Sequence, residues 1–577
     1  MTQNKNITIG IDLGTTNSEV SIIQDGIPKI IKIDGSAIMP SVVSFQKNGD
    51  ILVGQHALNN AVAAPESTIF LIKRKMGKNE LLEINGKSYS PQMISSFILQ
   101  RLKVAAEEYL KQSVTQAVIT VPAYFDELQR EATKEAAELA GLEVLRLLNE
   151  PTSAALCYAL GQKRSEVVLV YDLGGGTFDV SIVDLSNDVM EVRASHGDNQ
   201  LGGSDFDRMI YEAARQKIQD EHGFDIETDM SAKIRLMSAA EAAKIHLSNN
   251  SFADINEEFL FQHNGVGHHF SYRINRVEFE QMIRPSLEKT INSIKQALSQ
   301  ANCQADAIDR VILVGGSTKI PLVSQMIEEE LNIVPQCGMN PDTVVALGAA
   351  IEAANLSGEK LGSYMVDITP HSFGVETAGT FFGKEITTLI HKNTPLPATG
   401  SKVFYKCVES TQQVIVKAYQ GDSPKPENCR FLGTFNLENL SEQGKPEILI
   451  KFELNRNGIL NVTATEVSSG ISTTHTMKRI KASDFKKENL ADLGMVKLKV
   501  EEHGSIDEED LLEMENTFET ITKIGLSPEL EEKVKKLLAN ETLELSEKED
   551  LQKCFDEALT GEKEALEKLE ELVYFME

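Results

Sequence analysis

The chain has 577 residues, and its 86 Asp and Glu against 57 Lys and Arg give a formal charge of −29 at pH 7. Such an acidic chain is a poor candidate for binding nucleic acid, because proteins that bind phosphate backbones use clustered Lys and Arg. The length favours three or four domains over one compact unit.

The cysteines indicate neither a zinc site nor a disulfide framework, because they are scattered without C-x-x-C spacing. The start, MTQNKNITIGIDLG, lacks the basic and apolar regions of an export signal, and no later apolar run reaches the length of a membrane span. We therefore expect a cytoplasmic protein with reduced thiols and no membrane partner. The six cysteines are Cys157, Cys303, Cys337, Cys407, Cys429 and Cys554.

An internal duplication is the strongest signal near the N-terminus. Residues 7–23, ITIGIDLGTTNSEVSII, return as residues 167–183, VVLVYDLGGGTFDVSIV, with Asp12 and Asp172 in register. Each copy predicts two buried strands joined by a tight hairpin. A Gly-rich turn can hold phosphate with its N–H groups, and a nearby Asp can hold Mg²⁺ through water. A single turn of this kind often binds nothing, but two in register favour a clamp around one nucleotide.

Residues 1–361 alternate strand-like and helix-like runs, which predicts an α/β architecture, with the clearest helix at 126–140. A further glycine motif, VILVGGSTKIP at 311–321, places a turn after a buried strand and could bring backbone against a nucleoside. Glu241, Lys244 and Ser248 share one helix face. That pattern alone is more typical of a solvated face.

From residue 367 the sequence changes to short alternating runs, at 403–407, 414–419 and 448–454, which predict an antiparallel β domain. Asn457 and Gly458 predict a tight hairpin, because both residues tolerate positive φ. From residue 484 the chain is charged and predicts a small helical domain. We expect domains at 1–361, 368–483 and 484–577, with a linker at 362–367.

Several motifs then carry a family resemblance. IDLGTTNS, FLIKRKMG, VITVPAYFDELQR, LLNEPTSAAL, YDLGGGTFDVSI, LGGSDFD, EAAKIHLS, ILVGGSTKIP and NPDTVVALGAA follow in this order. They resemble the ATPase domain of DnaK-type chaperones of the heat shock protein 70 family, and TPHSFGVET resembles the segment after the linker. The resemblance covers about residues 5–482. It implies a duplicated actin-like ATPase fold, a β-sandwich that binds extended peptide, and a helical lid.

The resemblance also implies roles for single residues. Asp12 and Asp172 would position hydrated Mg²⁺, and K⁺ is a further candidate ion. The residues implied to be catalytic are Lys73, Glu150, Asp172, Thr177 and Asp179. The residues implied to bind ATP or ADP are Gly14, Thr15, Thr16, Asn17, Gly174, Gly175, Gly176, Glu241, Lys244, Ser248, Gly315, Gly316, Ser317, Lys319 and Asp342.

Within this set, Lys73 would offset charge on the γ-phosphate. Glu150 would orient the attacking water. Pro122 and Arg130 would relay the nucleotide state toward the peptide domain. Plainer interpretations exist, because a Lys in the basic run IKRK is typical of a surface residue and Glu150 could cap a helix near Pro151.

Two departures from the family pattern affect nucleotide exchange. Lys319 stands where the family usually has Arg, and an ammonium stacks on adenine less well than a guanidinium. We expect weaker nucleotide affinity or faster exchange. The stretch at 76–95 is shorter than usual, which puts contacts of an exchange factor in doubt.

The peptide site is matched by motif as well. Val375, Phe404, Val414 and Val416 resemble the pocket lining, although each alone would be a β-core residue. Ala378 and Cys407 resemble the arch over the peptide. Ala378 replaces the usual Met, so a more open groove is expected.

The linker and the tail depart too. The sequence Ser363-Tyr364-Met365-Val366 replaces a leucine-rich linker, so coupling between the two sites is expected to be weaker. The tail at 484–577 is shorter than the usual lid and is expected to act as a partial lid.

The favoured function is an ATP-dependent chaperone that binds extended apolar segments of unfolded clients. We expect a monomer that works with a J-domain co-chaperone and a nucleotide exchange factor. A specialised chaperone for iron–sulfur cluster assembly, or a member with low turnover, is the alternative within the family. An actin-fold small-molecule kinase is the alternative from another class, which the β domain after Asp367 disfavours.

Overall fold

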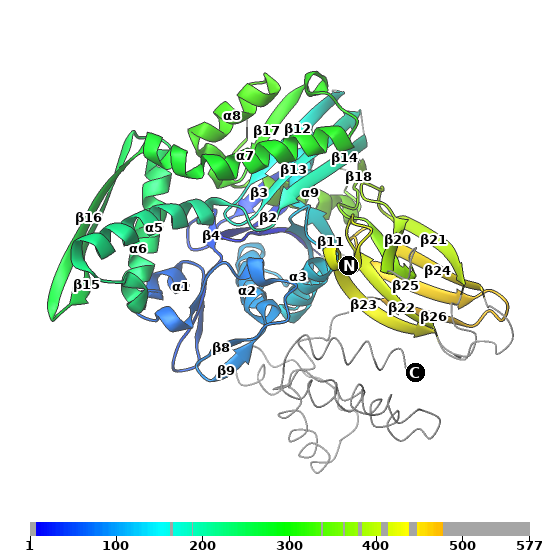
Figure 1. The fold of residues 1–577 in the computed structure, drawn as a ribbon, viewed down its shortest axis with the longest axis horizontal. Helices are drawn as coiled ribbons and strands as arrows, with labels where there is room; N and C mark the ends of the chain where they lie inside the picture. The colour runs from blue at the N-terminus through cyan, green and yellow to red at the C-terminus, as the bar shows by residue number, and fades with distance from the viewer. Residues whose placement is uncertain are drawn as a thin grey trace, which may run out of the picture. The chain divides into compact units, whose positions relative to one another are not determined.

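The computed structural model describes residues 7–161, 165–186, 189–335, 339–359, 361, 364–378, 384–405, 414–437 and 447–476. All of them belong to one compact unit, Met1–Met495. The predicted helical domain at 484–577 lies outside the described residues, as do Cys337, Ser363 and Cys407. Figure 1 shows the α/β part in blue to green and the all-β part in yellow to orange.

The first duplicated hairpin lies inside a mixed sheet with the order β11-β10-β1-β2-β3, and β4 pairs with β2. Strands β1, β10 and β11 are parallel, whereas β1–β2 and β2–β3 are antiparallel. Both faces of β1 and β2 are buried, which explains their continuous apolar runs. The strands of this sheet are β1 (Thr8–Leu13), β2 (Asn17–Gln24), β3 (Ile27–Ile31), β4 (Met39–Pro40), β10 (Gln116–Val121) and β11 (Glu143–Asn149).

The second hairpin lies in a sheet of similar construction, with the order β17-β12-β13-β14-β18. Strands β12 and β13 pair antiparallel, from Glu166 opposite Leu185 to Leu173 opposite Phe178. Both predicted hairpins are therefore confirmed. The strands of this sheet are β12 (Glu166–Leu173), β13 (Phe178–Ser186), β14 (Val189–Asp198), β17 (Arg310–Val314) and β18 (Tyr364–Val366).

Two helices, α4 (Glu150–Ala159) and α9 (Val344–Leu356), cross closely beside these sheets. A Cβ on Gly348 would lie 1.8 Å from the Ser153 carbonyl oxygen, and one on Gly10 would lie 2.3 Å from the Ala350 nitrogen. Only glycine permits this approach. The contact fixes the helix that begins at Glu150 against the first hairpin.

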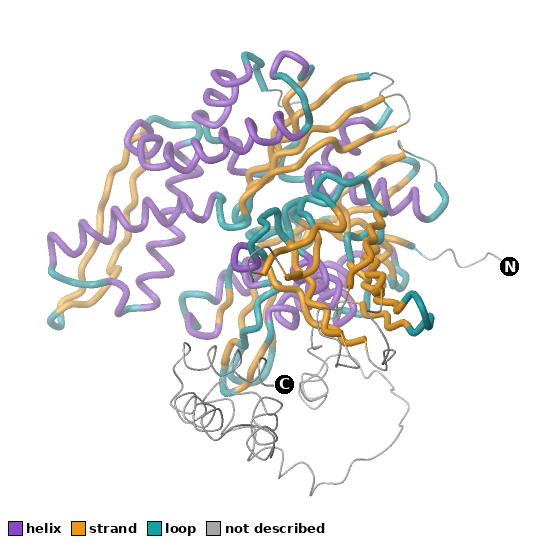
Figure 2. Tube along the Cα trace, turned by 45° about the vertical axis from the view of Figure 1, so that its right-hand side comes forward, coloured by secondary structure: helices purple, strands orange, loops and turns teal. Residues whose placement is uncertain are grey.

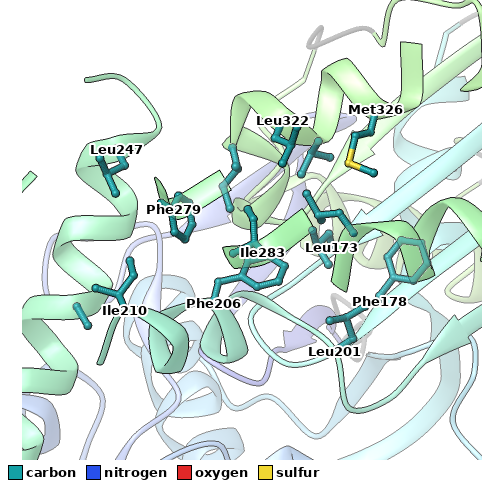
Figure 3. Close-up of a cluster of buried hydrophobic side chains, with 14 of the residues drawn as sticks. Leu173, Phe178, Leu201, Phe206, Ile210, Leu247, Phe279, Ile283, Leu322 and Met326 are labelled. Atoms are coloured by element: carbon teal, nitrogen blue, oxygen red, sulfur yellow. The ribbon is translucent and has the colours of Figure 1, made fainter. Parts of the chain in front are cut away.

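The remaining helices are drawn in purple in Figure 2; some pack on the two large sheets, whereas others pack on short hairpins or on other helices. The helix predicted at 126–140 is confirmed as α3, which Asp126 and Gln129 start with a capping box. Figure 3 shows the apolar core of the second half, including Phe178, Phe206 and Phe279. These helices are α1 (Gln55–Asn60), α2 (Pro91–Leu110), α3 (Glu127–Leu139), α5 (Gly203–His222), α6 (Met230–Leu247), α7 (Arg276–Gln300) and α8 (Pro321–Leu331).

Short hairpins and turns complete the α/β part. The shortened stretch at 76–95 carries a small hairpin of its own, β8–β9. The other short strands are β5 (Val43–Phe45), β6 (Ile51–Val53), β7 (Thr68–Ile69), β8 (Leu82–Ile84) and β9 (Lys87–Tyr89), and a longer hairpin joins β15 (Phe252–His263) to β16 (Val266–Asn275). The 3₁₀ turns of this part, among the described residues, are η1 (Pro65–Ser67), η2 (Ile72–Lys75), η3 (Ile226–Thr228), η4 (Ala305–Ala307) and η5 (Gly316–Lys319), and a further turn, η7 (Pro426–Asn428), lies in the all-β part.

The all-β part is a sandwich of two antiparallel sheets, with the orders β20-β19-β22-β23 and β21-β24-β25-β26. One shared core fills the space between them, with Phe373, Phe435 and Phe452 among its buried members. Its strands are β19 (Phe373–Ala378), β20 (Lys384–Ile390), β21 (Ala398–Tyr405), β22 (Val414–Gln420), β23 (Arg430–Leu437), β24 (Glu447–Leu454), β25 (Leu460–Glu466) and β26 (Ser472–Thr476).

The hairpin at Asn457-Gly458 was predicted in the right place but with the wrong turn. Gly458 has a φ of 74°, whereas Asn457 is not among the described residues with positive φ. The loop is wider than a two-residue turn, because Leu454 pairs with Leu460 and the Asn455 amide donates to the Ile459 carbonyl.

None of the described helices is both long and apolar enough to cross a membrane.

Candidate functional site

The two glycine turns face each other. A Cβ on Gly175 would lie 1.8 Å from the Thr16 hydroxyl oxygen, and one on Gly176 would lie 2.3 Å from the Thr15 methyl carbon. Thr15 is buried, and the Gly174 amide donates to the Thr177 carbonyl, which closes the second turn. The structure thus brings the two predicted phosphate loops into contact. Where the second loop meets Thr15 and Thr16, it has room for glycine only.

Beneath the loops, carboxyl groups from both hairpins gather. Asp12 accepts a 2.7 Å hydrogen bond from the Thr120 hydroxyl, and Asp179 accepts one of 3.0 Å from the Tyr124 amide. Burial, together with the charges of Glu150 and Asp179, raises the pKa of Asp172 well above its usual value. Burial and Glu150 likewise raise the pKa of Asp179 to about 7. So many buried acids in one place favour a bound cation, which would stabilise their charged forms.

Lys73 meets Glu150 in this cluster, at an Nζ–Oε1 distance of 2.5 Å. Lys73 is only 4% exposed, so it is not a surface residue. Leu71, in a left-handed conformation, begins the turn η2 that turns Lys73 inward. Glu150 is the first residue of α4 and pairs with Lys73. Burial raises the pKa of Glu150 to about 7, although Lys73 lowers it.

The donor set fits a magnesium ion held mainly through water and phosphate. Carboxylate oxygens are the ligands that Mg²⁺ prefers, and the ion usually keeps several waters. Among the described residues, no three His, Cys, Asp or Glu side chains converge closely enough to hold a metal directly. Asp12 and Asp172 would therefore hold the ion through its bound water molecules.

The predicted nucleoside residues lie around the second loop. Lys244 forms a 2.7 Å ion pair with Asp207, and Ser317 donates a 2.9 Å hydrogen bond to the Gly174 carbonyl. A Cβ on Gly203 would lie 2.4 Å from the Ser317 hydroxyl oxygen and 3.1 Å from Lys244 Nζ. Lys244 and Ser317 therefore meet at the start of α5.

The other nucleoside residues are more loosely placed. Lys319, whose side chain is 51% exposed, pairs with Asp342 at 2.5 Å. The Ser248 hydroxyl donates a 3.4 Å hydrogen bond to the carbonyl of Lys244, one turn earlier on α6. Burial raises the pKa of Asp207, and the negative charge of Glu241 adds to this rise.

Arg74 is a residue of this site that the sequence analysis missed. Its Nε donates a 3.0 Å hydrogen bond to the Gly176 carbonyl, and its two terminal nitrogens reach Asp205 at 3.0 and 2.5 Å. Asp205 also accepts the Gly202 amide at the start of α5. Arg74 thus ties turn η2 to the second loop. The one available signal was its place directly after Lys73.

A chain of hydrogen bonds joins Asn149, the residue before Glu150, to the linker. Asn149 accepts a 2.5 Å hydrogen bond from Arg130 and donates to both Asp367 carboxylate oxygens, at 2.8 and 2.9 Å. Arg130 also donates to the carbonyls of Ala123 and Phe125. The Ala123 carbonyl belongs to the residue after Pro122, and the Phe125 amide donates to the Pro122 carbonyl at 3.1 Å, so Arg130 contacts the segment that begins at Pro122.

The linker strand β18 pairs in parallel with β14, from Tyr364 against Val189 to Val366 against Glu191. Met365 is half-buried against the core beside α4 and α9, whereas Tyr364 is 68% exposed. The second sheet of the α/β part therefore includes the linker as its edge strand.

The sandwich contacts α3 and β11 through hydrogen bonds. The Leu460 amide donates to Glu127 Oε1 at 2.7 Å, and the Glu127 amide donates to Gln420 Oε1 at 3.1 Å. The Leu147 amide donates to the Asn457 side chain at 3.1 Å. Burial raises the pKa of Glu127 to about 8, and its Oε2 has no partner among the described residues.

A charged contact adds to this interface. Arg430 forms an ion pair with Asp126 and donates a 3.0 Å hydrogen bond to the Gly77 carbonyl.

The predicted peptide residues divide into two groups. Val375 and Val416 are fully buried in the sandwich core, whereas Phe404 and Val414 are partly buried against it. Cys407 and the side chain of Ala378 lie outside the described residues. Strands β21 and β22 present further apolar side chains to solvent, which the sequence analysis did not single out: Val403, Tyr405 and Ile415.

Two duplicated sheets with facing glycine turns over buried carboxylates define the actin-like class of nucleotide-binding proteins, here joined to a β-sandwich. The chain matches the family model described as "Hsp70 protein" over residues 8–81 and 78–576. It therefore belongs to the Hsp70 family. Members of this family are ATPases that bind ATP and ADP with Mg²⁺ and act as ATP-dependent chaperones. They bind unfolded clients and work with J-domain and exchange-factor partners.

Proposed function

We propose that this chain hydrolyses ATP between its two glycine loops and that the nucleotide state sets the affinity of the sandwich for extended apolar peptide. The hydrogen bonds from Asn149, the neighbour of Glu150 in the chain, to Asp367 support this proposal best. They connect the residue beside Glu150 to the segment that leads into the sandwich.

Each polar residue of the site would have a separate role in hydrolysis. Lys73 would offset charge on the γ-phosphate, and Glu150, released from Lys73 as the phosphate enters, would orient the attacking water. Asp12 and Asp172 would hold hydrated Mg²⁺, which would offset the negative charge of the phosphates. Thr177 and Asp179 would complete the floor of the site. A positioned carboxylate of this kind typically contributes about 10²- to 10⁴-fold.

The finer assignments made from the sequence stay proposals. They are the ATP contacts, the peptide pocket, K⁺ as a further ion, the domain limits at 1–361, 368–483 and 484–577, the monomeric state and the cytoplasmic location.

A specialised or low-turnover chaperone is the second candidate. The exposure of Tyr364 favours it, because a linker that buries little apolar area stabilises docking less. A small-molecule kinase is disfavoured, since contacts such as Glu127 with Leu460 tie the sandwich to the α/β part.

Single-turnover hydrolysis of ATP, with and without an apolar model peptide and a J-domain protein, tests the proposal. We expect peptide and J-domain protein to accelerate hydrolysis, and Glu150→Gln to abolish it while ADP still binds. A burst of ADP that depends on a metabolite and ignores peptide would instead indicate a kinase.

A further inference from the structure

The turn η2 is anchored in the first half of the α/β part, the half that contains the first glycine loop. Ile72 and Met76, at the two ends of the turn, are buried in the apolar core of that half. Lys73 and Arg74 lie between them and have different partners, because Lys73 contacts Glu150 whereas Arg74 contacts the second half. One short turn therefore carries both the lysine proposed for the γ-phosphate and a link to the second half.

Arg74 binds its partners through three nitrogens. Its Nε donates to the Gly176 carbonyl at 3.0 Å, and its two terminal nitrogens donate to the two Asp205 oxygens at 3.0 and 2.5 Å. A guanidinium that holds a carboxylate with two hydrogen bonds fixes direction as well as charge, which the ammonium of lysine does not. The Arg74 side chain is only 16% exposed. This pair therefore differs from the exposed ion pairs that contribute little.

The groups that this guanidinium holds belong to one unit of the second half. The Gly202 amide donates to Asp205 Oδ2 at 2.8 Å, and the Gly203 amide donates to the Gly174 carbonyl at 2.9 Å. A Cβ on Gly202 would lie 2.5 Å from the Gly176 nitrogen, so the two segments are in close contact. The start of α5 is thus fastened to the second glycine loop. If this unit moves away from η2, all three hydrogen bonds of the guanidinium break together.

We propose that Arg74 is a positioning residue for ATP hydrolysis, which holds the turn η2 against the second half and so fixes Lys73 beside the γ-phosphate and slows the release of nucleotide. This inference rests on the proposed function. Arg74 acts through the placement of Lys73 and of the second glycine loop, and the inference assigns no direct contact between Arg74 and the nucleotide.

Three variants test the geometry of this link. Arg74→Gln removes the charge and the paired hydrogen bonds, Arg74→Lys keeps only the charge, and Asp205→Asn keeps an oxygen that can accept the Gly202 amide. Arg101→Gln is the matched control, because Arg101 pairs with Asp34 at 2.7 Å within the first half and is comparably exposed. The readouts are the single-turnover rate at saturating ATP, the release rate of fluorescent ADP, and Tm without nucleotide.

Arg74→Gln should release ADP about tenfold faster or more, because hydrogen bonds to a charged group are lost. It should slow single-turnover hydrolysis by about 10²-fold, since misplacing a positioned group by about 1 Å has an effect of this size. Asp205→Asn should shift both rates in the same directions, and Arg74→Lys should lie between Arg74→Gln and the parent. Arg101→Gln should leave both rates within about twofold of the parent.

A variant that already lacks Lys73 separates positioning from direct participation in the chemistry. In the Lys73→Met background, Arg74→Gln should slow hydrolysis no further, because the group that Arg74 positions is gone. It should still accelerate ADP release, because the link between the two halves is lost in either background.

An unchanged hydrolysis rate or an unchanged ADP release rate in folded Arg74→Gln would overturn the inference. A further loss of hydrolysis from Arg74→Gln in the Lys73→Met background would also overturn it. Parent-like rates in Arg74→Lys would do the same, which keeps the test decisive should Arg74→Gln fail to fold. Failure of the proposed function looks different, since the parent protein itself would bind no adenine nucleotide in the presence of Mg²⁺.

Discussion

Lys73 and Glu150 form a buried ion pair, and substituting them separates a role in catalysis from a role in stability. Removing one partner of a buried pair leaves the other charge uncompensated, which typically costs about 3–5 kcal/mol. Lys73→Met should therefore lower the free energy of unfolding by about 3 kcal/mol and slow single-turnover hydrolysis by about 10²- to 10³-fold. Chemical denaturation and rapid-quench assays would measure the two effects.

The double variant Lys73→Met with Glu150→Gln is the control. It should recover most of the lost stability, because no buried charge remains unpaired, and it should recover none of the activity. Equal stability of the single and double variants would contradict a buried, charged pair.

Lys319 gives a second test at the residue scale. It is half-exposed and paired with Asp342 beside η5. Since a planar guanidinium can pair with a carboxylate and stack on a base at once, Lys319→Arg should slow the release of fluorescent ADP severalfold. An unchanged release rate would reject the link between Lys319 and fast exchange.

At the scale of elements, the hairpins β1–β2 and β12–β13 were predictable because both repeat one apolar pattern around a glycine turn. Helix α3 was predictable from its capping residues. The linker strand β18 was not, because its pairing with β14 depends on a partner far away in the sequence.

Similar reasons explain the misses at the sites. Arg74 and Asn149 act through partners that no local pattern reveals, namely Asp205 and Asp367. The turn at Asn457 differs from its prediction because the Asn455 side chain accepts hydrogen bonds from the Asn457 and Ile459 amides, which stabilises a wider loop. Tertiary contacts decided the cases of Arg74 and Asn149, and a local side chain decided the turn.

The linker strand yields a prediction at this scale. Met365 is half-buried against the core beside α4 and α9, so Met365→Asp should detach β18 from β14. We expect the basal ATPase rate to persist and its stimulation by peptide to fall to near zero. Tyr364→Asp is the matched control, because Tyr364 is 68% exposed and should tolerate the charge. Equal behaviour of both variants would contradict coupling through this strand.

At the scale of the whole molecule, docking of the sandwich buries ionisable groups. The pKa of Glu127 is raised to about 8 in the docked structure, chiefly by burial, with Glu131 and Asp126 raising it and the Leu460 amide and Arg130 lowering it. The ordinary pKa of Glu127 is 4.5, so between pH 4.5 and about 8 the carboxyl group takes up a proton when the sandwich docks. The contribution of Glu127 to docking is complete below pH 4.5 and is lost as the pH rises through 8.

His371 acts in the opposite direction, because burial lowers its pKa to about 4 from 6.5 and docking then releases a proton. The two effects cancel between about pH 4.5 and 6.5. Docking should therefore weaken from pH 6.5 to 8, by at most about tenfold per unit. Interdomain fluorescence transfer with ATP would measure it. Glu127→Gln should remove the dependence, and a persistent slope in that variant would assign it to other groups.

The central claim is that nucleotide bound between the glycine loops controls how firmly the sandwich holds a peptide. The most direct measurement is the dissociation rate of a fluorescent apolar peptide, chased with unlabelled peptide, from protein saturated with ATP or with ADP in Mg²⁺. The coupling path through Asn149 and Asp367 predicts faster release with ATP, and the same rate in both nucleotides after Met365→Asp. Equal release rates with ATP and ADP in the parent protein would contradict the account.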